Sequence, residues 1–188
     1  AGVEIVFYDA LTPGERDYTA ILTKLKAAAP DVVFFTGYYP ETGMLLRQKK
    51  EMGWDVPMMG GDAANHQDLV KIAGADAAKG YFFISPPLPQ DMDTQEARHF
   101  LEAYKARYQS VPVSVWAVVA GDAYKVIEAA LAAGKTDPED MAQWLKQLKD
   151  MPGLTGKLGF DEKGDRVGEF YRSYMVDEQG KFILLPQK

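Results

Sequence analysis

Several residues that could bind a small charged molecule follow short apolar runs in the first half of the sequence. They are Asp9, Tyr38, Tyr39, Asp62 and the pair Ser85-Pro86. A carboxylate beside phenol hydroxyls or ring faces suits a cationic amino group, through charge-assisted hydrogen bonds and cation–π attraction. If the apolar runs are parallel strands, their carboxyl ends meet at one edge of a sheet, which is where such sheets bind ligands. The pattern therefore predicts a site for an amino group.

Each of these residues also has a structural interpretation. Asp9 could cap a turn, and Tyr38 and Tyr39 could pack within a loop. Asp62 could cap the helix that follows it, with Asn65 as the competing cap. Their shared location at the ends of apolar runs favours the binding interpretation over the separate structural ones.

Trp116 stands at the start of a long apolar segment. It could form an apolar wall that faces a ligand, or it could be part of a hydrophobic core. Trp54, beside Gly53 at a predicted helix end, is interpreted as packing, and Trp144 as core, because it lies in an amphipathic stripe. Trp116 is therefore the one tryptophan that we include in the predicted site.

Catalytic, metal-binding and cofactor-binding patterns are missing. The two histidines, His66 and His99, are far apart in the chain, and none of the four serines lies in a G-x-S-x-G turn. Neither a P-loop nor a G-x-G-x-x-G fingerprint occurs. The acidic run at 161–165 lacks the alternating ligands of a calcium loop and reads as a polar turn. The sequence predicts a protein that is not an enzyme and that holds no metal or cofactor.

Composition narrows the class further. The 188 residues are 47% hydrophobic, 12% aromatic and 26% charged, which is typical of a folded domain and too apolar for disorder. A formal net charge of −6 argues against a nucleic-acid partner. The chain has no cysteine, which excludes disulfides and thiolate chemistry and is compatible with export to an oxidising compartment.

The elements expected to position these residues alternate in the first half of the chain. Apolar, β-branched and aromatic runs predict strands, and the i, i+3, i+4, i+7 spacing of apolar residues predicts helices between them. The predicted strands are 3–8, 31–36, 57–60 and 80–85, and the predicted helices are 17–28, 40–52 and 67–73. The run at 31–36 is nearly all apolar, which predicts a strand buried on both faces. Such alternation indicates an α/β fold with a parallel sheet.

After the proline-rich segment 86–89 the pattern changes. Helices are predicted at 94–108, 114–133 and 137–149, and strands at 157–160, 170–176 and 181–185. The helix at 114–133 is apolar enough to be expected against a sheet, yet the helical middle has no predicted strand of its own. We therefore divide the chain into βα units of one lobe (1–86), helices of another lobe (87–152) and closing strands (153–188).

Four stretches resemble the type I periplasmic solute-binding proteins of branched-chain amino-acid ABC transporters, the leucine/isoleucine/valine-binding proteins. They are VEIVFYDALTPGERDY, DVVFFTGYYPETGMLLRQKKEMG, MMGGDAAN and LTGKLGFDEKGDR. The resemblance spans essentially the whole chain and implies a two-lobed clamp that closes on its solute by hinge motion. It also implies that a tyrosine and an acid hold the solute's α-amino group, at positions that fall on Tyr38 and Asp62. The apolar wall of the family falls on Trp116.

The chain departs from that family in two ways. Asp62 stands where members often carry glutamate, and the chain resembles only their C-terminal half. The resemblance implies that two parts are absent: the part of the first lobe that binds the α-carboxylate, and the opening βα unit of the second lobe. We expect a processed or excised piece whose helices 94–108 and 114–133 expose apolar faces, and which dimerises or swaps elements to bury them.

The resemblance implies a periplasmic or lipid-anchored extracytoplasmic protein that delivers its solute to an ABC permease. Two other functions stay open from the residues themselves. The same fold could form the ligand-sensing domain of a receptor or regulator, or an α/β enzyme with an unrecognised site. The solute stays open among branched-chain amino acids, amides and aromatic acids.

Overall fold

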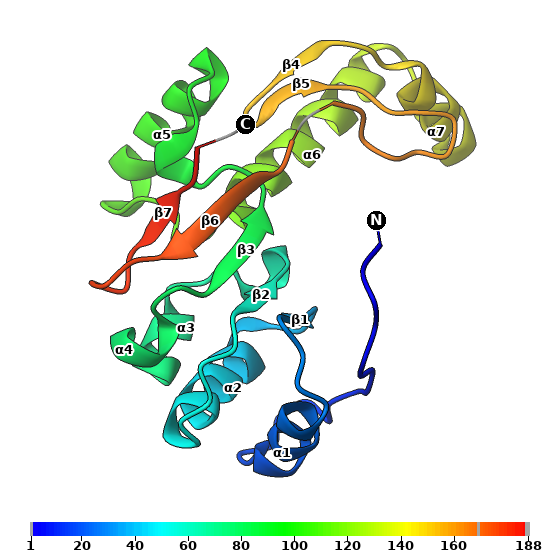
Figure 1. The fold of residues 1–188 in the computed structure, drawn as a ribbon. Coiled ribbons are helices and arrows are strands. Elements are labelled where there is room, and N and C mark those ends of the chain that lie inside the picture. Colours follow the sequence, from blue (N-terminus) through cyan, green and yellow to red (C-terminus); the bar gives the residue numbers. More distant parts are fainter. Residues whose placement is uncertain (1, 169, 187–188) are drawn as a thin grey trace. The chain divides into compact units, whose positions relative to one another are not determined.

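The computed structural model describes residues 2–168 and 170–186. The chain forms two compact units: unit 1 is Ala1–Ser85 with Arg172–Lys188, and unit 2 is Pro86–Tyr171. Figure 1 follows the chain through the elements of each unit. The chain leaves unit 1 after Ser85 and returns to it at Arg172, so these two crossovers define the boundary. The division into lobes at residues 86 and 152 refers to the two-lobed protein that the resemblance implies, and it stays a prediction.

Unit 1 is built on a five-stranded sheet in the order β1-β2-β3-β6-β7. Its strands are β1 (Val33–Phe35), β2 (Met58–Gly60), β3 (Phe82–Ser85), β6 (Arg172–Val176) and β7 (Phe182–Leu184). β1, β2 and β3 are parallel, whereas β6 runs antiparallel to β3 and β7 antiparallel to β6. The parallel α/β sheet predicted for the first half of the chain is confirmed, and the closing strands extend it.

Helices connect and cover the parallel strands of unit 1. They are α1 (Thr19–Ala27), α2 (Tyr39–Glu51), the 3-10 turn η1 (Asp62–Ala64), α3 (Asp68–Ala73) and α4 (Ala75–Ala78). α2 has Pro40 in its first turn, where proline's missing amide costs nothing, and Gly53 follows its end at φ 58°. The side chains of Leu22, Leu46, Leu69 and Phe83 are at most 2% exposed and form the core.

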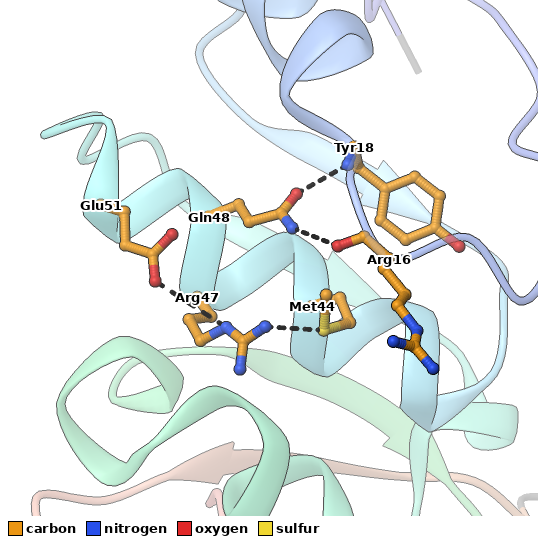
Figure 2. Close-up of polar contacts among 6 residues, drawn as sticks. All are labelled: Arg16, Tyr18, Met44, Arg47, Gln48 and Glu51. Carbon is orange, nitrogen blue, oxygen red and sulfur yellow. Dashed lines mark hydrogen bonds and ion pairs between the residues drawn. The ribbon is translucent and has the colours of Figure 1, made fainter.

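A buried amide ties the segment before α1 to α2. The Gln48 side chain is 8% exposed; its Oε1 accepts from the Tyr18 amide at 2.7 Å, and its Nε2 donates to the Arg16 carbonyl at 2.9 Å. Figure 2 shows this pair of bonds beside the exposed ion pair of Arg47 and Glu51. Because both partners are backbone groups, Gln48 stabilises the packing of α1 on α2.

Two sequence predictions for unit 1 are wrong. The segment predicted as a strand at Val3–Tyr8 is extended but pairs with no strand among the described residues, and Val3, Ile5 and Tyr8 are exposed (dark blue in Figure 1). β-propensity alone does not make a strand without a neighbour to pair with. β1 was expected to be buried on both faces, but it is an edge strand and Phe34 is 58% exposed.

Unit 2 contains η2 (Pro89–Asp91), α5 (Gln95–Tyr108), α6 (Trp116–Ala132), α7 (Pro138–Gln147) and the antiparallel hairpin β4 (Met151–Gly153) with β5 (Gly156–Leu158). Thr94 caps α5 by accepting the Ala97 amide at 3.0 Å, and Asp137 caps α7 through two amides of its first turn. The three helices were therefore predicted correctly. Strand β4 was not predicted.

A buried carboxylate holds the β4–β5 turn against α6. Asp122 is 5% exposed and accepts the Leu154 amide at 2.5 Å, the Thr155 amide at 3.0 Å and the Thr155 hydroxyl. Arg166 donates to the same hydroxyl at 2.7 Å and lies 3.8 Å above the centroid of the Phe170 ring. Burial lowers the pKa of the Arg166 guanidinium, and the charge of Asp122 opposes that shift. This polar network organises unit 2.

Burial in unit 2 agrees with the expectation for one helix and differs for another. An apolar helix such as α6 normally lies against a sheet, and in this piece it was expected to expose an apolar face; Tyr124, Ile127 and Leu131 are 70%, 45% and 49% exposed. Trp144 was predicted as core but is half-buried. No residue of α7 is fully buried. Among the described residues, none of the helices has the length and apolar character needed to cross a membrane.

Candidate functional site

Tyr38 and Asp62 follow neighbouring parallel strands of unit 1. The register pairs Phe35, the last residue of β1, with Gly60, the last residue of β2. Tyr38 is the third residue after β1 and Asp62 the second after β2. Because the two strands are parallel and in register, both loops leave the sheet at its carboxyl edge. The structure thus brings the loops of the predicted tyrosine and acid to one edge.

The backbone of Tyr38 is fixed while its ring stays accessible. Tyr38 is the N-cap residue of α2, and its carbonyl accepts both the Thr42 amide at 3.0 Å and the Thr42 hydroxyl at 2.7 Å. Thr42 is completely buried, whereas Tyr38 is 69% exposed. The phenol is therefore available to a solute from a well-anchored position.

Glycines let both loops leave the edge beneath aromatic rings. A Cβ on Gly37 would lie 2.1 Å from Phe35 Cζ, and a Cβ on Gly60 would lie 2.0 Å from the hydroxyl oxygen of Tyr81. Distances this short are sterically forbidden, so any larger residue would displace a ring. The first glycine of G-G-D thus faces a buried ring, whereas the glycine of the G-Y-Y segment faces the half-buried ring of Phe35.

Asp62 is the first residue of η1 and is half-buried. Its carbonyl accepts the Asn65 amide at 2.9 Å, which closes the turn. Gln67 is the N-cap residue of α3 and its side chain makes no capping hydrogen bond, so neither Asp62 nor Asn65 stands at the cap position of that helix.

Two contacts that the sequence did not reveal join the Asp62 loop to its neighbours. The ring of His66 stacks on Tyr39, the first residue of α2, with centroids 4.4 Å apart and planes 18° apart. On the other side, Asn65 Nδ2 donates to the hydroxyl of Ser85, the last residue of β3, at 2.6 Å. The only sequence signal for either contact is that Asn65 and His66 follow Asp62 in the same loop.

His66 is also held from within its own segment. Its Nδ1 accepts the Asp68 amide at 3.1 Å and lies 3.6 Å from the Asp68 carboxylate. That carboxylate pairs with Lys71 at 2.6 Å, and the hydrogen bond from Lys71 lowers the pKa of Asp68. These contacts orient the imidazole that stacks on Tyr39.

The other predicted residues lie elsewhere in the fold. Asp9 is exposed in the extended N-terminal segment, where its carboxylate accepts the amide of Ala10 at 2.9 Å, so it does not follow a strand as expected. Trp116 begins α6 in unit 2 and is 46% exposed. Its predicted role as an apolar wall stays a prediction, as does a solute contact by Asp9.

The edge offers charge, hydrogen-bonding groups and ring faces. A half-buried carboxylate and a phenol suit an ammonium group, which a charge-assisted hydrogen bond and a ring face both attract. Across the described ranges, no three or more histidine, aspartate or glutamate side chains gather in a way that could hold a metal ion.

Comparison with known proteins shows the family to which the chain belongs. A sequence profile described as periplasmic binding protein matches residues 1–181. A leucine-, isoleucine-, valine-, threonine- and alanine-binding protein of Pseudomonas aeruginosa is 36% identical over 166 residues, which are 88% of this chain and 43% of that protein. The Leu/Ile/Val-binding protein BraC3 of Rhizobium johnstonii is 32% identical over 185 residues, 97% of this chain and 48% of its own length.

Solved structures show the same relation. A leucine-binding protein, LivK, of Thermotoga maritima superposes with a TM-score of 0.82 at 28% identity, covering 94% of this chain and 49% of that one. The branched-chain amino acid transporter substrate-binding protein LivJ of Streptococcus pneumoniae, solved in complex with isoleucine, superposes with a TM-score of 0.74 at 32% identity. The match covers 92% of this chain and 48% of that one. The chain therefore spans about half the length of the relatives it matches, and its fold is that of a type I periplasmic binding protein, incomplete in this chain.

Proposed function

The chain belongs to the periplasmic binding protein family, and on that premise we propose that it forms the C-terminal half of a solute-binding protein for a branched-chain amino acid. The observation that carries this proposal is the placement of the Tyr38 and Asp62 loops on adjacent parallel strands at one edge. Relatives named for binding leucine, isoleucine and valine support the solute class. The proposed role is binding without chemical conversion.

In the proposed mechanism, Asp62 holds the ammonium of the solute and Tyr38 adds a hydrogen bond or a ring-face contact. The other lobe then covers the solute by hinge motion, and an ABC permease recognises the closed form. The protein would act on the outer side of the cytoplasmic membrane. In the full-length protein of this proposal, α6 belongs to that other lobe, and its exposed stripe (Tyr124, Ile127 and Leu131) packs against the remainder of the lobe.

Calorimetry with L-leucine, L-isoleucine and L-valine tests the proposed function in the full-length protein. One charge-assisted contact contributes about 1.5–3 kcal/mol, so Asp62→Asn should weaken binding by about 10- to 150-fold. The matched control is Asp76→Asn, since Asp76 is an exposed acid of the same unit that pairs with Lys50 at 3.2 Å. Equal affinity for wild type and Asp62→Asn would remove Asp62 from the site.

The exposed stripe of α6 also predicts how the 188-residue chain behaves without the remainder of the proposed protein. The 188-residue chain should associate at micromolar concentration, because an uncovered apolar stripe favours self-association. Size exclusion with light scattering measures this, and a monomer at all concentrations would contradict the assignment of the stripe to a covered surface.

A further inference from the structure

The Asp62 loop is anchored to the centre of the sheet by one buried hydrogen bond. Asn65 is 3% exposed and Ser85 is completely buried, and the 2.6 Å contact of Asn65 Nδ2 with Ser85 Oγ joins residues twenty positions apart. A hydrogen bond between two buried side chains is stronger than an exposed one and costly to leave unmade. The contact therefore restrains the loop far more than a surface contact would.

The anchor residue belongs to the central strand of the sheet. Ser85 belongs to β3, which is the third of five strands and is paired on both sides, with β2 and with β6. Ser85 lies opposite Arg172, so it stands at the crossovers where the chain leaves and re-enters unit 1. A loop bonded to Ser85 is therefore bonded to a buried residue that β6 pairs at the end of the central strand.

Asn65 is connected directly to Asp62 through the backbone. Its amide donates to the Asp62 carbonyl at 2.9 Å, so one residue bonds to Asp62 with its main chain and to Ser85 with its side chain. The stack of His66 on Tyr39 restrains the same loop from the side of α2. The loop that carries Asp62 is thus held by contacts with both neighbouring elements.

We infer that Asn65 is a positioning residue for the ammonium of the solute, acting through Asp62 by tying the loop 61–66 to Ser85; this rests on the proposed function. Preorganisation of this kind raises affinity because the loop need not be ordered when the solute binds. Loss of the tie should therefore weaken binding without removing any group that touches the solute.

The test compares Asn65→Ala and Ser85→Ala with a matched control in the full-length protein. The control is Gln48→Leu, which removes another buried carboxamide of unit 1 that bonds only to residues 16 and 18 (Figure 2). Asn65→Ala and Ser85→Ala should each weaken L-leucine binding by about 5- to 30-fold. The double variant should be no weaker than the weaker single variant. Gln48→Leu should lower the melting temperature and leave the affinity unchanged.

A second cycle separates positioning from general destabilisation. If Asn65 acts through Asp62, the substitution Asp62→Asn should lower the affinity for L-leucine less in the Asn65→Ala background than in wild type. The two factors of loss should differ at least about threefold. Additive losses, or equal affinity losses in Asn65→Ala and Gln48→Leu, would overturn the role of Asn65.

Hydrogen exchange decides whether the tie exists even without a solute. Amides of residues 61–66 should exchange faster in Asn65→Ala and Ser85→Ala than in wild type, and should not change in Gln48→Leu. Unchanged exchange in the first two variants would overturn the inference by itself. Failure of the wild type to bind any of the three amino acids would instead overturn the proposed function, and the exchange measurement would still judge the tie.

Discussion

Gly60 is the position at which a single methyl group should disturb the candidate site most. A Cβ there would lie 2.0 Å from the Tyr81 hydroxyl oxygen, about 1.5 Å closer than an ordinary van der Waals contact. Tyr81 is 1% exposed and its ring lies 6.0 Å from that of Phe83, so it has little room to move. Overpacking of this kind costs about 1–3 kcal/mol, and we expect Gly60→Ala to lie at the upper end of that range.

The Tyr81 hydroxyl offers a way to separate the clash from other effects. Burial raises the pKa of Tyr81 well above its usual value, with the Thr42 side chain opposing the shift, and in the described part of the chain its oxygen has no hydrogen-bond partner of good geometry. Tyr81→Phe alone should therefore change the free energy of unfolding by less than about 1 kcal/mol. Combined with Gly60→Ala, it removes the closest atom and leaves contacts of 3.0 Å to the Phe35 carbonyl and 3.2 Å to the ring.

The double variant Gly60→Ala/Tyr81→Phe should recover more than half of the stability that Gly60→Ala loses. Urea unfolding of all four proteins, followed by circular dichroism, measures the cycle. Because Gly60 lies two residues before Asp62, solute affinity should fall and recover in parallel in the full-length protein. If the losses of the two single variants simply add, the clash with Tyr81 is not the cause and the packing explanation fails.

Three further changes follow from the same structure. Gly37→Ala should lower the free energy of unfolding in urea by about 1 kcal/mol, less than Gly60→Ala does. The added methyl group meets the Phe35 ring at 2.1 Å, but that ring is half-buried on an edge strand and can move away. Phe35→Leu in the same chain should restore most of the lost stability. Asp122→Ala should destabilise unit 2 by about 3 kcal/mol, since it leaves the buried Leu154 amide and the part-buried Thr155 amide unpaired, and hydrogen exchange at the β4–β5 turn should accelerate. Asp137→Ala should lower the free energy of unfolding by about 1 kcal/mol, because it removes the side chain that accepts two amides of the first turn of α7. A clearly larger loss in thermal unfolding would show that Asp137 does more than cap the helix.

The sequence predicted the elements whose signals are local. α2 could be placed because Pro40 and Gly53 mark its two ends, and the alternation of apolar runs with amphipathic spacing predicted the parallel strands. From the parallel strands it followed that the Tyr38 and Asp62 loops share an edge. That step needed no knowledge of side-chain packing, only the rule that parallel strands end together.

Features that depend on pairing could not be predicted in this way. The segment at 3–8 has strong β-propensity but no strand beside it in the described residues, whereas β4 contains Pro152 and Gly153 and still pairs with β5. The bond between Asn65 and Ser85 depends on how the loop after β2 folds back toward β3. Such a contact has no signature in residue spacing, which is why Asn65 read only as a possible helix cap.

The position of these groups also limits what unit 1 can distinguish in a solute. Asp62 and Tyr38 are suited to an ammonium, which leucine, isoleucine and valine share, and the ties at Asn65 and His66 act on the loop that carries Asp62. A change at Asn65 should therefore weaken the binding of all three amino acids by the same factor, within the roughly twofold error of such affinity measurements. A change in their ranking would mean that the loop contacts the part of the solute that differs. If the factors are equal, selectivity for the side chain resides outside this edge, and the loop contributes affinity alone.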